Sequence, residues 1–85
     1  MQDDNFADPS GLTLSEIANF IEMAWPKVNY AARPYLNAMK ALNNVDQAYG
    51  SNSGRAIVTY FLSNASSWQG DAARQVKAEL RRRIR

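Results

Sequence analysis

The sequence predicts an all-α protein, a compact bundle of about four short helices. Apolar residues recur at intervals of three and four over most of the chain, which is the period of an amphipathic helix. No segment has the two-residue alternation of a half-buried strand, and nothing indicates a hairpin. With 85 residues, of which 46% are hydrophobic, the chain fits one domain. We expect a flexible acidic arm over residues 1–12 and a single helical domain over residues 13–85.

The first helix is predicted to begin at Thr13, because Thr13 and Glu16 have the spacing of a capping box. Pro26 lacks an N–H group and disfavours helical geometry in the residue before it, so this helix should end near Trp25. Its apolar stripe consists of Leu14, Ile17, Phe20, Ile21, Ala24 and Trp25.

The second helical segment spans about residues 27–47 and contains Pro34. A helix that is kinked at Pro34 fits the pattern. Two helices split before Pro34 fit it as well. The helical period continues through the proline in Val28, Ala31, Ala32, Tyr35, Met39, Leu42, Val45 and Tyr49.

The third and fourth helices follow a clear break over residues 49–54. Ser53 is placed to cap the third helix, which should run to about Trp68. Gly70 then stops it, and Asp71 caps the fourth helix. We expect the core to contain Ile17, Phe20, Ile21, Tyr35, Met39, Leu42, Ile57, Tyr60, Phe61, Trp68, Val76 and Leu80.

Composition excludes several classes of function. The chain has no His and no Cys, so the common general base, the thiolate nucleophile and the common metal ligands are missing. We therefore expect no enzyme, no cofactor and no metal site. No apolar run approaches the roughly 20 residues of a membrane span, and the acidic start of the chain is unlike a signal peptide. These features favour the cytoplasm of a bacterium or of a host cell.

The preferred interpretation is a non-enzymatic protein-binding module that self-associates. Aromatic residues and Met are enriched at interfaces and are dense in this chain. Opposed charges would steer docking, because residues 1–25 carry five carboxylates and no base. Such a composition is common among small accessory proteins of phages and mobile elements, which act by occluding or bridging a partner. The candidate partner-binding residues are Met23, Trp25, Tyr30 and Tyr49.

An alternative is nucleic-acid binding by the basic C-terminal helix, since guanidinium groups bind phosphates well. Its base-reading side chains are few, apart from Gln75, so sequence-specific recognition is disfavoured. A solvated helix face that pairs with the acidic first helix or with a partner would explain the same charges. The candidate phosphate-binding residues are Arg74, Lys77, Arg81, Arg82, Arg83 and Arg85.

A second alternative is a small-molecule or nucleotide binder that uses the loop over residues 50–55. Gly residues, hydroxyls and free N–H groups at a helix start are able to hold an anion. The loop lacks the ending of a phosphate-binding Walker A motif, and a plain helix connection with a Ser cap also explains it. The candidate residues are Ser51, Ser53, Gly54 and Arg55.

Overall fold

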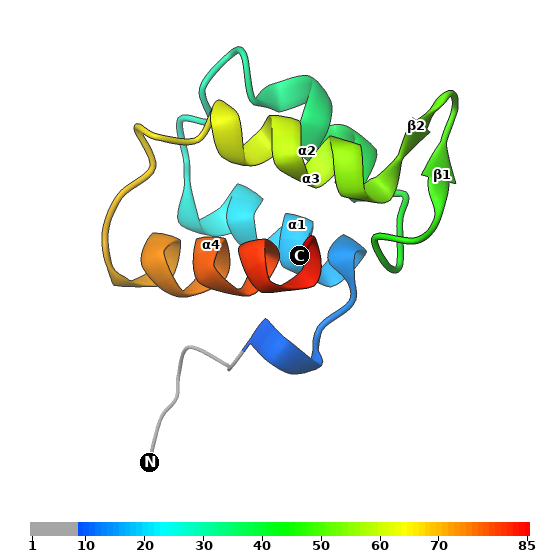
Figure 1. Ribbon diagram of the computed structural model, residues 1–85. Coiled ribbons are helices and arrows are strands. Elements are labelled where there is room, and N and C mark those ends of the chain that lie inside the picture. Colours follow the sequence, from blue (N-terminus) through cyan, green and yellow to red (C-terminus); the bar gives the residue numbers. More distant parts are fainter. Residues whose placement is uncertain (1–8) are drawn as a thin grey trace.

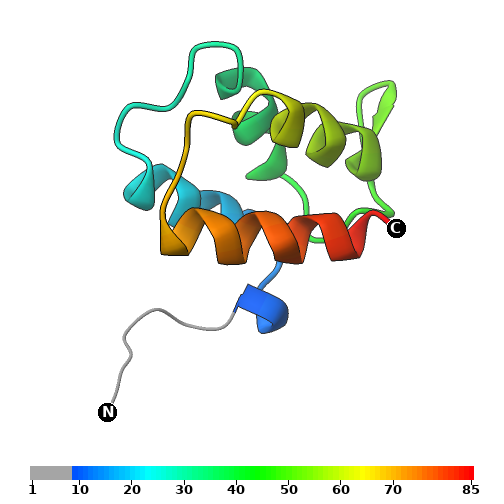
Figure 2. The same cartoon turned by 60° about the vertical axis from the view of Figure 1, so that its left-hand side comes forward.

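The structure, a computed structural model, describes residues 9–85, and these form four α-helices as predicted. Figures 1 and 2 show the helices in two layers, with α1 beside α4 and α2 beside α3. The helices are joined by short links and one small hairpin. In chain order the elements are η1 (Pro9–Gly11), α1 (Leu14–Ala24), α2 (Arg33–Met39), β1 (Ala48–Tyr49), β2 (Asn52–Ser53), α3 (Gly54–Ser63) and α4 (Asp71–Arg83).

Part of the predicted arm belongs to the folded body. The first eight residues lie outside the described part of the chain. Pro9–Gly11 form a single 3-10 turn, in which Pro9 is buried. This turn lies against α4 (Figure 2). The folded body therefore starts a few residues earlier than Thr13.

Two helix starts are confirmed as predicted. The backbone N–H of Glu16 donates to Thr13 Oγ1 over 3.0 Å, and the backbone N–H of Thr13 donates to Glu16 Oε1 over 2.8 Å. This is the reciprocal capping box. At the start of α3, Ser53 Oγ accepts a bond of 3.0 Å from the N–H of Ala56. Both caps satisfy backbone donors that the helix itself leaves without a partner.

The second helix is much shorter than the predicted 27–47 segment. It is confined to Arg33–Met39 and carries Pro34 in its first turn, where the missing N–H costs nothing. The boundary at the proline is thus the beginning of the helix and not a kink. Polar side chains bind the flanking backbone in non-helical turns. Asn29 Oδ1 accepts from the N–H of Ala31, and Gln47 Oε1 accepts from backbone N–H groups of the turn after α2.

The prediction that nothing forms a hairpin is wrong at one place. Strands β1 and β2 pair antiparallel, with Ala48 opposite Ser53 and Tyr49 opposite Asn52. Gly50 occupies the tight turn with φ of 62°, a conformation that favours glycine. Strands of two residues are too short to show any alternation in the sequence.

The link between the third and fourth helices is longer than predicted. Helix α3 ends at Ser63, not near Trp68, and turns fill the interval. Gly70, with φ of 110°, occupies the N-cap position of α4. Asp71 is therefore the first helical residue and not the cap. Its carboxylate pairs with Arg74 inside the first turn of the helix.

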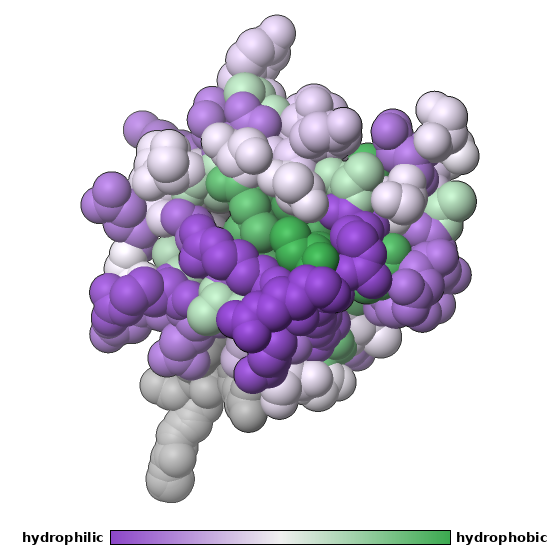
Figure 3. Space-filling view, in the orientation of Figure 1, coloured by the Kyte–Doolittle hydropathy of each residue, from purple (hydrophilic) through white to green (hydrophobic). Residues whose placement is uncertain are grey.

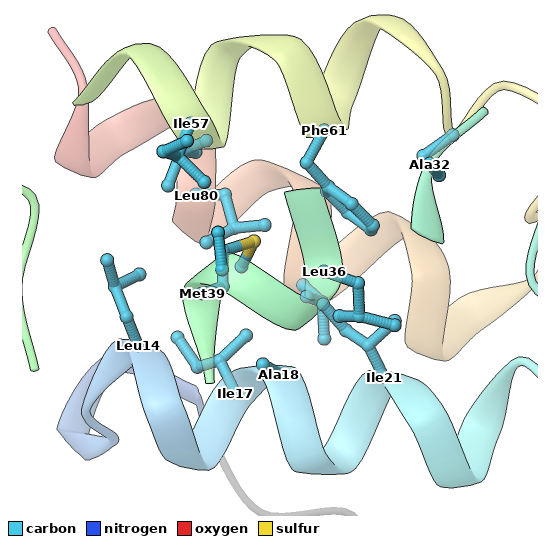
Figure 4. Packing of buried hydrophobic residues seen from close by; sticks show 14 of the residues in the cluster. Leu14, Ile17, Ala18, Ile21, Ala32, Leu36, Met39, Ile57, Phe61 and Leu80 are labelled. Carbon is cyan, nitrogen blue, oxygen red and sulfur yellow. The ribbon is translucent and has the colours of Figure 1, made fainter. Parts of the chain in front are cut away.

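The core lies between the two layers and draws on all four helices. In Figure 4, Leu14, Ile17 and Ile21 of α1 point toward side chains of α2 and α3. Of the predicted core residues, those confirmed as buried are Ile17, Ile21, Met39, Leu42, Ile57, Phe61, Trp68, Val76 and Leu80.

Three of the predicted core residues are less buried than expected. Phe20 and Tyr35 are half-buried and pack against the edge of the core. Tyr60 was wrongly assigned, because 45% of it is exposed. Each helical residue turns by about 100°, which carries Tyr60 past the edge of the face formed by Ile57 and Phe61. Its ring instead contacts that of Tyr35, with centroids 5.4 Å apart.

Candidate functional site

Two kinds of site are absent over residues 9–85. That part of the chain has no group of three or more His, Cys, Asp or Glu side chains that could hold a metal ion. None of its helices has both the length and the apolar character needed to cross a bilayer.

The predicted partner-binding residues fall into two groups. Met23, Tyr30 and Tyr49 are exposed, at 82%, 92% and 46%. Trp25 is 7% exposed and belongs to the core, so it is not a surface anchor. Its ring stacks on Trp68 with centroids 5.8 Å apart and planes inclined by 9°. This stack closes the end of the core at the link between α1 and α2.

The exposed tyrosines do not form one surface. Tyr30 lies in the connection between α1 and α2, and Tyr49 lies in the hairpin. Both views of the ribbon place this connection and the hairpin at opposite sides of the molecule (Figures 1 and 2). Tyr30 is the more exposed of the two and therefore the stronger candidate anchor.

An apolar hollow lies beside Tyr30 on the outer side of α2. It has a volume of about 490 Å³ and is lined by Tyr30, Ala31, Arg33, Pro34 and Asn37. We call these five residues the Tyr30 surface.

The loop that carries Tyr30 is fixed from both sides. The side-chain amide of Asn29 donates to the carbonyl of Asn64, next to the end of α3, over 3.0 Å. The oxygen of the same amide accepts from the N–H of Ala31 over 3.2 Å. The backbone of the loop is thus held against the body by its asparagine. The neighbouring Tyr30 ring projects into solvent from this fixed backbone.

The charge at the edge of the Tyr30 surface is neutralised within the chain. Arg33 Nη1 lies 3.1 Å from Glu22 Oε2, and Lys40 pairs with the same carboxylate. Hydrogen bonds from Lys40 and then from Arg33 hold the pKa of Glu22 below its ordinary value of 4.5. These ion pairs join α1 to α2 and leave the hollow without an unpaired cation.

The candidate phosphate-binding residues of α4 do not all face outward. Arg83 is only 19% exposed at its side chain and is directed into the body. Its guanidinium donates to Glu79 over 2.6 Å, to the carbonyl of Pro9 over 2.9 Å and to that of Ser10 over 3.2 Å. Arg83 therefore has a structural role and is wrongly assigned to the phosphate-binding set.

The remaining bases form an exposed face. Arg74 and Arg82 are 75% and 59% exposed at their side chains, and each pairs only within α4. Within residues 9–85, no acceptor binds the exposed side chains of Arg81 and Arg85. Lys77 Nζ donates to the carbonyl of Trp68 over 2.5 Å. Burial and then the charge of Arg81 lower the pKa of Lys77.

The expected pairing of this face with the acidic first helix is not found in the described part of the chain. The two carboxylates of α1 are used elsewhere, Glu16 in its own capping box and Glu22 in pairs with α2. The basic face of α4 is left open to solvent. Figure 3 shows a band of strongly hydrophilic surface over this helix.

The backbone donors at the start of α3, where the loop over residues 50–55 ends, are bound within the chain. The N–H of Gly54 donates to Gln47 over 2.6 Å, and that of Arg55 donates to Val45 over 3.0 Å. Ser53 Oγ is occupied as the cap of α3. Ser51 is exposed at the hairpin turn. The structure thus contradicts the expectation of free N–H groups at this helix start.

Arg55 instead caps the far end of another helix. Its guanidinium donates to the carbonyls of Arg83 and Arg85, each over 3.3 Å, and lies 3.5 Å from Asp46. Carbonyls at a helix C-terminus lack partners and carry partial negative charge. No local pattern in the sequence indicates this role, because Arg55 lies 28 and 30 positions from the residues whose carbonyls it binds.

The fold and these surfaces define a small all-helical protein with one projecting tyrosine and one basic helix face. No family model, no curated protein and no solved structure matches the chain.

Proposed function

We propose that this protein is a non-enzymatic protein-binding module that self-associates through the Tyr30 surface. The observation that carries the proposal is the 92% exposure of Tyr30 beside an apolar hollow. A protein gains nothing for its own folding by holding an aromatic ring in water. Aromatic rings of this kind are the usual anchors of protein interfaces, and removing one costs about 2 kcal/mol or more of binding free energy.

A second copy of the chain is the occupant that the Tyr30 surface fits best. A two-fold interface uses the same patch on both subunits, so the patch must be complementary to itself. A projecting ring next to an apolar hollow meets this condition, since each Tyr30 can fill the hollow of the other subunit. Arg33 does not oppose this contact, because Glu22 neutralises it.

The experiment compares Tyr30→Ser with Tyr49→Ser by sedimentation equilibrium. Both substitutions remove an exposed tyrosine, but Tyr49 lies in the hairpin on the other side of the molecule. We expect the parent chain and Tyr49→Ser to be dimers of equal affinity. We expect Tyr30→Ser to dimerise about 30-fold more weakly, which corresponds to about 2 kcal/mol.

Two outcomes would overturn the proposal. One is a parent chain that stays monomeric at millimolar concentration. The other is a Tyr30→Ser variant that dimerises as well as the parent chain. Circular dichroism of both variants shows whether the helices are retained. A dimer carries two copies of every other surface, which suits a protein that acts by occluding or bridging a partner.

A further inference from the structure

We propose that the outer face of α4 is a binding site for the phosphate backbone of nucleic acid, formed by Arg74, Lys77, Arg81 and Arg85. This site is separate from the Tyr30 surface and does not depend on self-association. The four bases follow one another at spacings of three, four and four residues. Such spacings place Arg74, Lys77 and Arg81 on one side of α4, and Arg85 follows two residues after the helix ends at Arg83.

The dimensions of the basic face suit a run of phosphates. Arg74 and Arg81 are seven residues apart in a regular helix, which is about 10 Å along its axis. Phosphates of one strand follow one another every 3.4 Å along a duplex axis, so about three of them span that length. Guanidinium groups at both ends of this run can each form two hydrogen bonds to a phosphate.

Three cations of this face are available to a ligand, and Lys77 keeps two N–H donors beside the one that binds the carbonyl of Trp68. Arg81 and Arg85 have no acceptor within residues 9–85, and the pair of Arg74 with Asp71 lies at the surface. Burial and then the nearby charge of Arg81 lower the pKa of the Lys77 ammonium group. Two neighbouring like charges repel each other, and a phosphate placed between them removes the repulsion.

The C-terminal end of α4 is prepared for an anion as well. A helix end normally presents carbonyls whose partial negative charge repels phosphate. Here Arg55 donates to the carbonyls of Arg83 and Arg85. The basic face therefore continues past the end of α4 to Arg85.

The chemistry favours nucleic acid over a bilayer or an acidic protein. The apolar residues of α4 other than Ala72 and Ala78, namely Ala73, Val76 and Leu80, are buried in the core, so this helix has no large apolar side chain to insert into lipid. The basic face also has no exposed aromatic anchor of the kind found in protein interfaces. Amide side chains read the edges of nucleobases, and Gln75 is the one amide beside the cations of this face. We therefore expect binding to be independent of base sequence.

The test measures binding of a fluorescent 20-base-pair DNA duplex and an RNA duplex of the same length by anisotropy. Four phosphate contacts predict that the affinity falls about 100-fold between 50 and 200 mM salt. In the triple variant Arg74→Gln, Arg81→Gln and Arg85→Gln one contact remains, so the same salt change should lower affinity only about threefold. Circular dichroism confirms that the triple variant is folded.

A pair of single variants separates the site from net charge. Arg81→Gln and Lys27→Gln each remove one exposed cation, but Lys27 lies in the connection between α1 and α2. We expect Arg81→Gln to weaken binding several-fold more than Lys27→Gln, and this comparison holds even if the triple variant fails to fold.

Three results would overturn the proposal. The first is the absence of binding to either duplex at 50 mM salt. The second is an equal loss in Arg81→Gln and Lys27→Gln, which would mean that net charge alone attracts the ligand. The third is binding of polyglutamate without binding of either duplex, which would show that the face recognises acidic protein.

Discussion

A single glycine explains why the start of α3 lies so close to the turn after α2. Gly54 begins α3 and is buried against the turn that follows α2. A Cβ atom at this position would lie 3.0 Å from the carbonyl oxygen of Asn44 and 3.0 Å from the Cα and oxygen of Val45. These neighbours are backbone atoms, which cannot turn aside as a flexible side chain does. The glycine is therefore required by space and not by its φ angle.

We predict that Gly54→Ala destabilises the protein by about 1–3 kcal/mol, the usual cost of overpacking. Alanine at an unobstructed helical position would instead stabilise the chain by restricting its unfolded state. Urea denaturation measures the difference. Gly11→Ala is the matched control, because its Cβ would meet nothing within 4 Å. Equal stability of Gly54→Ala and the parent chain would contradict the close approach.

The contrast between Trp25 and Tyr30 shows what sequence reasoning can and cannot assign at the residue scale. Trp25 stands four residues after Ile21, and this spacing correctly placed it on the apolar stripe of the first helix. Its assignment to a binding surface came from residue type alone, and it was wrong. Tyr30 lies beyond the helix, where no periodicity applies. Its exposure depends on Asn29, whose contact with Asn64 joins residues 35 positions apart.

At the scale of the elements, the pair of α1 and α2 is held by charge as well as by apolar contact. Glu22 of α1 faces Arg33 at the start of α2 and Lys40 directly after its end. The side chains of these two bases thus reach one carboxylate from opposite ends of a seven-residue helix. An isolated helix of that length is unstable in water, so its contacts with neighbours determine whether it forms.

The ion pairs of Glu22 predict a dependence of stability on acid. Its pKa is lowered in the folded state by Lys40 and Arg33, so its contribution is fully present above the ordinary value of 4.5. That contribution is lost as the pH falls below 4.5 through the lower folded-state pKa. Urea titrations at pH 7, 4 and 3 should show that Glu22→Gln is less stable than the parent chain at pH 7. The difference should shrink at pH 3.

The partners of Glu22 provide the check on this interpretation. If Lys40 and Arg33 cause the shift, then the double variant Lys40→Gln and Arg33→Gln should remove most of the effect of Glu22→Gln at pH 7. A difference between the parent chain and Glu22→Gln that stays constant from pH 7 to pH 3 would mean that another feature of this side chain stabilises the pair of helices.

Local patterns account for the helix starts but not for the lengths of the links. The caps at Thr13 and Ser53 were predictable, because each depends on residues within one turn. The short extent of α2 was not, since the helical period of the sequence continues well beyond Met39. There, side-chain amides such as those of Asn29 and Gln47 bind nearby backbone and replace helical hydrogen bonds.

In the whole molecule, two arginines that the sequence suggested for anion binding instead join elements that are far apart in the chain. Arg55 joins the start of α3 to the C-terminal end of α4. Arg83 joins α4 to the 3-10 turn η1 at the other end of the chain. Charge runs in a sequence show no difference between cations used for the fold and cations left for a ligand. Only the tertiary contacts separate Arg83 from Arg81.

This separation predicts opposite outcomes for two adjacent arginines. Arg82 and Arg83 pair with the same buried carboxylate of Glu79, but their side chains are 59% and 19% exposed. Arg83→Ala removes the half-buried partner of Glu79 and also the donors to Pro9 and Ser10. Since hydrogen bonds to charged groups contribute about 1.5–3 kcal/mol, we expect a loss of stability of about 2 kcal/mol. Arg82→Ala removes a largely exposed partner and leaves Glu79 paired with Arg83, so it should cost less than about 1 kcal/mol.

Hydrogen exchange shows whether the loss arises where the structure places it. In Arg83→Ala the amide of Leu12, which donates to the carbonyl of Pro9 within η1, should exchange faster, because the turn is no longer held to α4. In Arg82→Ala the exchange of this amide should match that of the parent chain. If both variants release the turn equally, then the apolar contact of Pro9 holds η1 against α4, and the guanidinium of Arg83 does not.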